Sequence, residues 1–303
     1  MKPVMQTVEE LPQAASAAVT AKLPVSVIIA ARNEALNLPR CLASLADVGE
    51  VYVVDSQSAD ATPEIARSYG AKVVQFHYHG GWPKKRQWAM DKLPLAYEWV
   101  LLLDADEALT PQLAGEIRNA IQNPWVDGYY ISLQMFFLGR ILRHGDANFW
   151  KLSLFRQRKG HYECRLNEQV PSMADMEVHE HVVVDGQAGR LRNPLLHENV
   201  DSLSRYIYKH NEYSNWEARV LLQGESGDGE LHPSLFGNQA QRRRWFKKKF
   251  YAVPGSPVLL FLCRYFARLG CLDGVPGLIY CAFQAVQIFH TKAKIYELRM
   301  RRS

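Results

Sequence analysis

The first half of the chain alternates short β-branched runs with segments of helical periodicity, and this alternation constrains the fold more than any other feature. Strands alternating with helices favour parallel pairing, with helices on both faces of the sheet. Ligands then bind at the carboxyl ends of the strands. The sequence therefore predicts an α/β fold built on a mostly parallel sheet. The expected strands are 25–30, 51–54, 72–76 and 99–103, and the expected helices are 33–45, 61–69, 83–93 and 111–122.

The pattern changes after Trp125, where strands are expected at 128–135, 149–155 and 182–185 and a long helix at 203–222. With 48% hydrophobic and 22% charged residues the chain is not of the disordered class. We therefore expect one globular domain over 23–222, followed by a Gly- and Ser-rich linker at 223–240. Residues 1–22 lack the basic start and apolar run of a secretory signal and are expected to form a flexible lead-in.

A strongly basic tail at 241–303 follows the acidic body. It carries 13 Lys and Arg residues against Asp273 and Glu297, whereas the whole chain has a net charge of only +5. Two apolar stretches, 258–272 and 275–289, are each shorter than the ~20 residues of a spanning helix. This combination predicts amphipathic helices that lie on an anionic membrane. A soluble helical hairpin packed on the domain is the alternative, and no recognition motif supports nucleic-acid binding.

The five cysteines show no C-x-x-C spacing. Their odd number and placement argue against a disulfide framework and a zinc knuckle, and fit a reducing compartment.

The segment Leu101-Leu102-Leu103-Asp104-Ala105-Asp106-Glu107 carries the sharpest chemical signal. Two carboxylates follow a buried strand at the edge where a parallel sheet exposes its ligand site. Ionised carboxylates are costly there unless a cation compensates them. Mg²⁺ and Mn²⁺ prefer oxygen ligands and also bind phosphates, so the pair predicts a metal that carries a diphosphate. An acidic cluster at a helix N-terminus is the alternative.

The other strand ends carry polar residues without a phosphate loop. Ala30-Ala31-Arg32-Asn33-Glu34 and Asp55-Ser56-Gln57-Ser58 contain neither G-x-G-x-x-G nor G-x-x-x-x-G-K-[ST], so dinucleotide and P-loop sites are poorly supported. Asp55 is placed to accept a hydrogen bond from a base or a ribose. Asp60 is expected to cap the following helix.

Together the segments V-S-V-I-I-A-A-R-N-E, V-V-D-S-Q-S-A-D-A-T, G-G-W-P-K-K-R-Q-W-A-M and L-L-L-D-A-D-E resemble the family 2 glycosyltransferases of the GT-A fold. The resemblance covers about 25–213. It implies that Asp104 contacts ribose or metal-bound water, that Asp106 ligates Mn²⁺ or Mg²⁺, and that other positions bind the nucleotide sugar. These are Ala30, Arg32 and Glu34 around the nucleotide, Asp55 at uracil, and Lys84 and Arg86 at the base or diphosphate. Many members have Pro or Thr where this chain has Ala30, which leaves only main-chain contacts there.

An inverting transfer needs a carboxylate that accepts the proton of the acceptor hydroxyl. Val178-His179-Glu180-His181 resembles a V-H-E segment of the bacterial lipopolysaccharide-core branch, and this resemblance implies Glu180 as the base. Glu168 and Asp185 are rival candidates. The downstream Leu195-Leu196-His197 implies His197 as a further metal ligand. A zinc site at His179 and His181 lacks a third ligand at familiar spacing.

The tail segment Leu272-Asp273-Gly274-Val275-Pro276-Gly277-Leu278 also resembles that branch. The resemblance implies transfer from a UDP-sugar to a lipid-linked or lipopolysaccharide acceptor at the cytoplasmic face of a bacterial inner membrane. A nucleotidyltransferase is the nearest rival enzyme, but its Gly-rich loop is missing. A non-enzymatic membrane adaptor on a dead transferase fold is the other rival, and the intact D-A-D and V-H-E segments argue against it.

Overall fold

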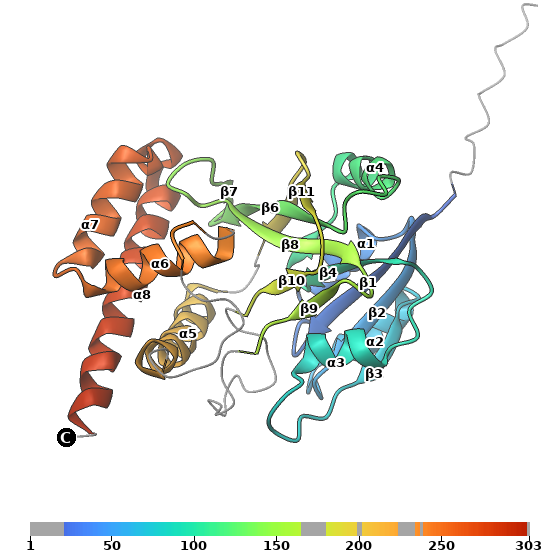
Figure 1. The fold of residues 1–303 in the computed structure, drawn as a ribbon, viewed down its shortest axis with the longest axis horizontal. Coiled ribbons are helices and arrows are strands. Elements are labelled where there is room, and N and C mark those ends of the chain that lie inside the picture. The colour runs from blue at the N-terminus through green and yellow to red at the C-terminus, as the bar shows by residue number, and fades with distance from the viewer. Residues whose placement is uncertain (1–20, 165–179, 199–201, 224–233, 237–238, 302–303) are drawn as a thin grey trace, which may run out of the picture.

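In the computed structural model, one mixed sheet forms the centre of the molecule (Figure 1). The structure describes residues 21–164, 180–198, 202–223, 234–236 and 239–301. The expected lead-in at 1–22 therefore lies almost wholly outside the described residues, and so does most of the expected linker at 223–240. The strand order is β3-β2-β1-β4-β8-β6-β12-β5, with β7 and β11 paired to β6.

The four predicted parallel strands form one half of this sheet. They are β1 (Leu23–Ala31), β2 (Val48–Asp55), β3 (Lys72–Gln75) and β4 (Trp99–Asp104). In the register, Ala30 lies opposite both Val54 and Asp104, and Ala31 lies opposite Asp55. The carboxyl ends of β1, β2 and β4 are therefore level, which brings the predicted ligand residues to one edge.

Alternating side chains of these strands feed two cores. Val27 and Ile29 face a cluster shared with α1 (Leu38–Ala43), α2 (Thr62–Ser68) and α4 (Pro111–Ala120). Ile28 faces the other cluster, which includes α3 (Lys85–Lys92). Helix α1 begins at Leu38 rather than at the predicted Asn33. Asn33 has a positive φ of 54°, so the chain leaves β1 through a loop instead of entering a helix.

The second half of the sheet is mostly antiparallel. Strand β8 (Phe149–Arg156) lies between β4 and β6 (Gly128–Phe137), and β6 also pairs with β7 (Arg140–Ile141) and β11 (Ala188–Arg190). Strand β12 (Leu195–Glu198) joins β6 to β5 (Glu107–Ala108). A separate pair, β9 (Gly160–Tyr162) and β10 (Val182–Val184), covers the α3 face. The predicted α/β class is confirmed, but the short strands β5, β7, β9, β11 and β12 were not predicted.

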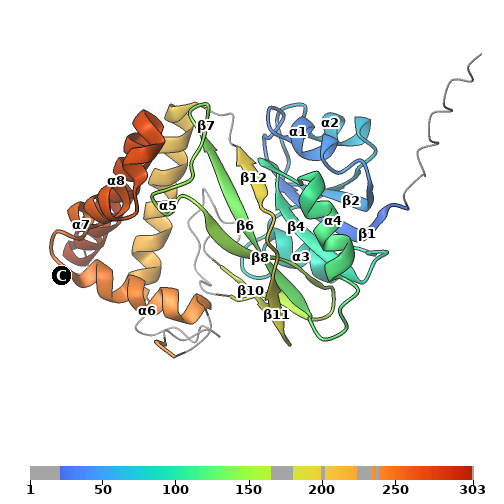
Figure 2. The ribbon, with the colours of Figure 1, turned by 90° about the horizontal axis from the view of Figure 1, so that it is seen from above.

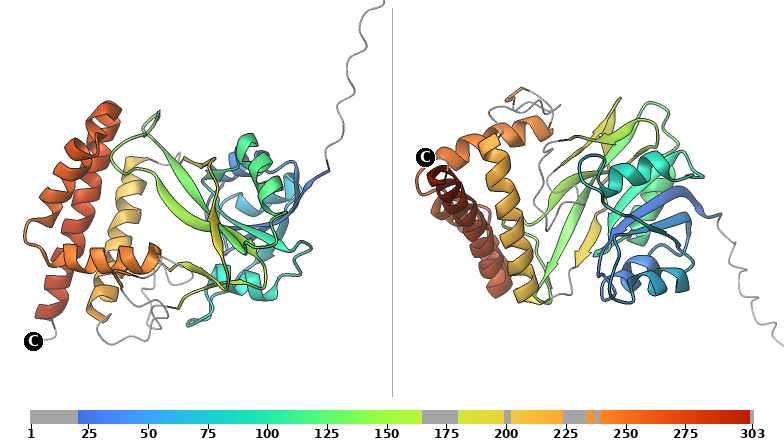
Figure 3. Two further views of the ribbon diagram at one scale, coloured as in Figure 1. Left: turned by 45° about the horizontal axis from the view of Figure 1, so that its top comes forward. Right: turned by 90° about the horizontal axis from the view of Figure 1, so that it is seen from below.

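The tail packs on the domain through α5 (Leu203–Gln223), which lies between the sheet and α8 (Figure 2). Its helices are α6 (Gln239–Ala252), α7 (Ser256–Leu262), the π-turn η2 (Cys263–Ala267), the 3₁₀ turn η3 (Gly270–Asp273) and α8 (Gly274–Met300). Figure 3 shows α7 and α8 side by side. The second apolar stretch was expected at 275–289, but α8 continues to residue 300. Gly270–Met300 is consequently long and apolar enough to cross a membrane, by length and composition alone.

Side-chain and backbone contacts fix the tail to the loop after β7. Both oxygens of the buried Asp273 are used: Oδ2 accepts from the backbone N–H groups of Arg143 and His144 at 3.0 and 2.9 Å, and Oδ1 lies 3.0 Å from His144 Nδ1. Gly277 permits close packing, because a Cβ there would lie 2.3 Å from the carbonyl oxygen of Gly270. The tail is thus docked on the domain along part of its length.

Candidate active site

Two loops at the level strand ends are joined by hydrogen bonds. The N–H of Asn33 donates to Ser58 Oγ at 2.8 Å, and the N–H of Glu34 donates to Thr62 Oγ1 at 2.8 Å. Asp60 accepts from the N–H groups of Ala35 and Thr62, at 3.2 and 3.0 Å, so it links the loops instead of capping α2 from the N-cap position, which Ala61 occupies. The loops form the floor on which the predicted nucleotide residues sit.

Four of the predicted nucleotide residues, Ala30, Arg32, Glu34 and Asp55, lie at the ends of β1 and β2 beside these loops. Asp55 is buried, and its carboxylate accepts from the Ser58 N–H at 3.1 Å, from Gln75 Nε2 at 2.9 Å and from the Ser58 hydroxyl. Arg32 is exposed directly after β1, where Ala30 is half-buried. Glu34 accepts from Asn37 Nδ2 at 2.7 Å. Burial would raise the pKa of Asp60, but its hydrogen bonds from Thr62 and Ala35 outweigh burial and lower that pKa.

Asp104 is held between two cations. Arg86, from the first turn of α3, forms an ion pair with Oδ1, and Lys151 Nζ of β8 lies 3.0 Å from Oδ2. Burial alone would raise the pKa of the Asp104 carboxyl, but Lys151 and Arg86 hold it far below its usual value. Lys151 also lies 3.2 Å from Oε1 of the buried Glu107, whose pKa burial raises.

Asp106 faces His197 rather than these cations. Its Oδ1 lies 3.6 Å from His197 Nδ1, because β12 pairs with β5 and sets His197 opposite Glu107. Arg40 fixes this junction, since its Nη2 donates to the Asp106 carbonyl at 2.9 Å and its Nη1 pairs with Glu198. The Glu198 N–H donates to the same carbonyl at 3.0 Å. The two predicted metal ligands, far apart in sequence, are thus side by side.

The donor chemistry of this pair fits a divalent cation. His197 Nδ1 is buried and has no hydrogen-bond partner among the described residues, and an imidazole nitrogen beside a carboxylate is a common ligand set. Within the same described part of the chain, no group of three or more His, Cys, Asp or Glu side chains gathers around one point. A cation held by these two side chains would complete its shell with ligands from outside the protein, such as water or phosphate oxygens.

Glu180 forms a buried ion pair with Lys84. Lys84 Nζ lies 3.0 and 2.8 Å from the two carboxylate oxygens, and the two side chains are 2% and 0% exposed. Lys84 is the N-cap residue of α3, two positions before Arg86, so one helix start connects Glu180 to Asp104. The predicted base therefore lies beside the acidic site and not across the molecule.

The rival candidates are exposed or lie outside the described residues. Asp185 is exposed, one residue beyond the end of β10, and His181 is exposed as well. Glu168 and His179 lie outside the described residues.

Sequence reasoning missed three residues of this site: Lys151, Arg40 and Tyr213. Tyr213 of α5 lies near the carboxylates of Asp106 and Asp104. Burial, together with the negative charges of these two groups, raises the pKa of Tyr213 to about 12. A lone lysine within the apolar strand 149–155 was the only local signal for Lys151. Arg40 and Tyr213 carry no such signal, because their roles depend on contacts between distant segments.

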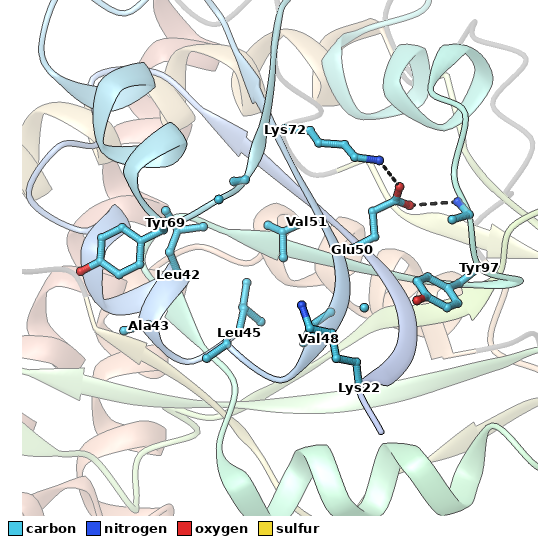
Figure 4. Close-up of a pocket in the computed structure, with 15 residues that line it drawn as sticks. Lys22, Leu42, Ala43, Leu45, Val48, Glu50, Val51, Tyr69, Lys72 and Tyr97 are labelled. Atoms are coloured by element: carbon cyan, nitrogen blue, oxygen red, sulfur yellow. Dashed lines mark hydrogen bonds and ion pairs between the residues drawn. The ribbon is translucent and has the colours of Figure 1, made fainter. Parts of the chain in front are cut away.

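A cavity of about 460 Å³ lies at the opposite, amino-terminal ends of β1, β2 and β3 (Figure 4). Its one buried carboxylate, Glu50, already accepts from Ser26 Oγ at 2.6 Å, Lys72 Nζ at 2.7 Å and the Ala96 N–H at 2.9 Å. This cavity lies at the end of the strands opposite to Asp104 and its buried carboxylate is already satisfied, so we assign no chemistry to it.

The fold matches that of solved glycosyltransferases of the GT-A class. A mannosyltransferase from Pyrobaculum calidifontis, solved with GDP-Man and Mn²⁺, superposes with a TM-score of 0.52 at 14% identity, over 90% of this chain and 87% of that one. The chain belongs to the family described as "Glycosyl transferase family 2", whose model matches residues 26–181, just over half of the sequence. It is an enzyme of that family.

Two curated relatives extend over nearly the whole chain. The lipopolysaccharide core biosynthesis glycosyltransferase LpsC of Rhizobium meliloti is 28% identical over 91% of this chain and 93% of its own length. An uncharacterized glycosyltransferase of Rickettsia bellii is 27% identical over 91% and 87%. The predicted resemblance to the lipopolysaccharide-core branch is therefore confirmed, and the similarity includes the tail.

Proposed function

We propose that this protein is an inverting, metal-dependent transferase that moves a sugar from a UDP-sugar to a lipid-linked or lipopolysaccharide-core acceptor at the cytoplasmic membrane face. The observation that carries this proposal is the Asp106–His197 pair: Asp106 Oδ1 lies 3.6 Å from His197 Nδ1, a buried nitrogen that has no hydrogen-bond partner among the described residues. The similarity to LpsC supports the acceptor class.

The nucleoside binds on the loop floor at the ends of β1 and β2. A carboxylate offers about four acceptor positions, and Asp55 uses three of them on Ser58 and Gln75. The remaining one is available to the N–H of uracil. Arg32, Glu34 and the main chain of Ala30 line the adjacent surface, and Asp104 accepts from the ribose or from metal-bound water.

The diphosphate binds between the acidic pair and the start of α3. A divalent cation held by Asp106 and His197 would neutralise the charge that develops on the leaving group. Arg86 and Lys84 approach the same oxygens from the N-terminal end of α3 and supply positive charge. Arg40 keeps Asp106 against β12, so that the two ligands remain opposed.

Glu180 accepts the proton of the acceptor hydroxyl as the hydroxyl attacks the anomeric carbon. A carboxylate paired with an ammonium group is a weak base, so Lys84 must leave Glu180 before the proton is transferred. An arriving diphosphate offers Lys84 another anionic partner. The acceptor is therefore activated only after the donor has bound.

Calorimetric titration with UDP and Mn²⁺ tests the metal assignment. We expect Asp106→Asn to abolish the Mn²⁺-dependent part of UDP binding and His197→Ala to weaken it. Asp47→Asn, which alters an exposed aspartate at the far end of the sheet, should bind like the wild type. Unchanged Mn²⁺-dependent binding in Asp106→Asn would refute the proposal.

Release of UDP from a panel of UDP-sugars, with a lipopolysaccharide-core acceptor present, tests the base. Glu180→Gln should lose transfer by about 10²–10⁴-fold while it still binds UDP. Asp185→Asn, a change in the exposed rival, should remain active. The opposite result would move the base to Asp185.

The tail supplies the membrane contact. Its helices expose large apolar side chains on α7, η2, η3 and α8: Val258, Leu262, Phe266, Leu269, Leu272 and Val275 are each 44–67% exposed. Arg242 and Lys249 of the preceding helix α6 are also exposed, and we propose that they meet anionic headgroups. We expect Phe266→Asp with Leu269→Asp to lower binding to phosphatidylglycerol vesicles about tenfold or more. Equal vesicle binding would place the membrane contact elsewhere.

A further inference from the structure

Lys151 is the least expected charge in the sheet. It lies on β8, where the register sets it opposite Ile131, between the strands β4 and β6. Its side chain is only 23% exposed. Its Nζ bridges Asp104 at 3.0 Å and Glu107 at 3.2 Å. A lysine placed between two carboxylates in the middle of a sheet satisfies them at a cost in desolvation, which calls for a reason beyond pairing the strands.

The three carboxylates of the Asp104–Glu107 turn are divided into two groups by these contacts. Asp104 and Glu107 share Lys151, and the second oxygen of Asp104 pairs with Arg86. Asp106 instead points to His197. Both carboxylate oxygens of Asp104 therefore have cationic partners, whereas the carboxylate of Asp106 lies beside the imidazole of His197.

We propose that Lys151 is a positioning residue: a resident cation that binds Asp104 and Glu107 and thereby confines an exchangeable divalent ion to Asp106 and His197. This inference rests on the proposed function, in which a metal binds at Asp106. Without the lysine, Asp104 and Glu107 would add their charge and their oxygens to the same pocket. A metal ion would then bind more tightly but nearer Asp104, away from its place beside His197.

The inference predicts opposite effects on metal binding and on transfer. A unit charge several ångströms from a divalent ion, at an effective dielectric constant of about 20, repels it enough to change its affinity by roughly tenfold or more. Lys151→Met should therefore bind Mn²⁺ in the absence of nucleotide at least about tenfold more tightly than the wild type, and should transfer sugar more slowly. A purely structural lysine would instead weaken both.

The experiment measures Mn²⁺ affinity by calorimetry and by the electron paramagnetic resonance signal of free Mn²⁺, in the full-length protein without nucleotide. Lys151→Arg keeps the charge and should restore wild-type affinity. Lys159→Met, an exposed lysine just beyond the same strand, is the matched control and should change nothing. Lys151→Met with Glu107→Gln removes the uncompensated buried carboxylate, and it should still bind Mn²⁺ more tightly than Glu107→Gln alone.

The outcomes separate this inference from the proposed function. If the wild type binds Mn²⁺ and Asp106→Asn does not, but folded Lys151→Met binds it no more tightly than the wild type, only the role of Lys151 is overturned. If the wild type binds no Mn²⁺ with or without UDP, both fail. If neither Lys151→Met nor its double variant folds, Lys151 serves stability and the inference is overturned.

Discussion

Removing one partner of the Lys84–Glu180 pair should destabilise the protein far more than removing both. The two side chains are 2% and 0% exposed, and Nζ contacts both carboxylate oxygens at 3.0 Å or less. Truncating one member leaves a buried charge without its partner, which typically costs 3–5 kcal/mol. We therefore expect Lys84→Met and Glu180→Gln each to lower the free energy of unfolding by about 3–5 kcal/mol.

The double variant removes the buried charge altogether. It has no ion pair, and the polar group that remains is the neutral amide in place of Glu180. The unmet hydrogen bonds of that amide cost about 1–3 kcal/mol of stability. The combined change should thus be smaller than either single change, which gives a coupling energy of several kcal/mol in a double-mutant cycle. The exposed pair Arg301–Glu297, at 72% and 55% exposure, provides the control, with an expected coupling below about 1 kcal/mol.

Urea unfolding at pH 7, followed by circular dichroism, measures all four corners of each cycle. Repeating the Lys84–Glu180 cycle with saturating UDP and Mn²⁺ tests whether the lysine changes partner, because the coupling should then shrink. Additive effects of the two buried changes would refute the reasoning about their burial. A coupling that UDP and Mn²⁺ leave unaltered would refute the release of Glu180 by the donor.

Three further predictions concern the tail and its support. Burial lowers the pKa of His210 on α5 to about 4, below its unfolded value of about 6.5, so neutral His210 contributes roughly 3 kcal/mol to the free energy of unfolding above pH 6.5 and this is lost as the pH falls toward 4. The free energy of unfolding in urea should therefore depend less on pH in His210→Gln, and an identical pH dependence would contradict this. Gly277→Ala should destabilise by about 1–3 kcal/mol through overpacking, whereas Gly115→Ala in α4, where a Cβ meets nothing within 4 Å, should be neutral or stabilising in the same assay. Asp273→Ala should speed proteolysis between the tail and the domain, since it removes the oxygen that accepts from the N–H groups of Arg143 and His144 and the oxygen beside His144 Nδ1; an unchanged cleavage rate would show that this contact does not hold the tail.

The half of the fold that the sequence predicts well is the half governed by local patterns. Strands β1, β2 and β4 are apolar runs whose burial leaves a clear signal, and their parallel order brings Asp55 and Asp104 to one edge without further information. Strand β12 has no such signal because it is short. Its pairing with β5, which sets His197 against Asp106, could be anticipated only from the resemblance to known relatives.

Other features escaped prediction for specific physical reasons. Lys151 looks like an ordinary solvent-facing position of an amphipathic strand until β6 and β4 enclose that strand. The apolar stretch of α8 ends near residue 289, but the helix continues because its polar last turns keep helical periodicity and hydrogen-bond to α5, as Lys294 does with Asn211 at 2.8 Å. Ion pairs such as Lys84 with Glu180 depend on side-chain packing that no spacing in the sequence encodes.

One strand joins the tail to the reaction centre. On β6, Met135 lies opposite His197, while Phe137, two residues further on, packs against Tyr280 of α8. The tail helix α8 and the His197 imidazole are thus both placed by residues 135–137 of β6. If the tail docks on a bilayer as proposed above, this short link sets the height of the His197 imidazole above the headgroups. Acceptors of different length would then be discriminated by the height of their hydroxyl group above the membrane. A hydroxyl held too close to the lipid, or too far from it, would not meet the anomeric carbon of the donor.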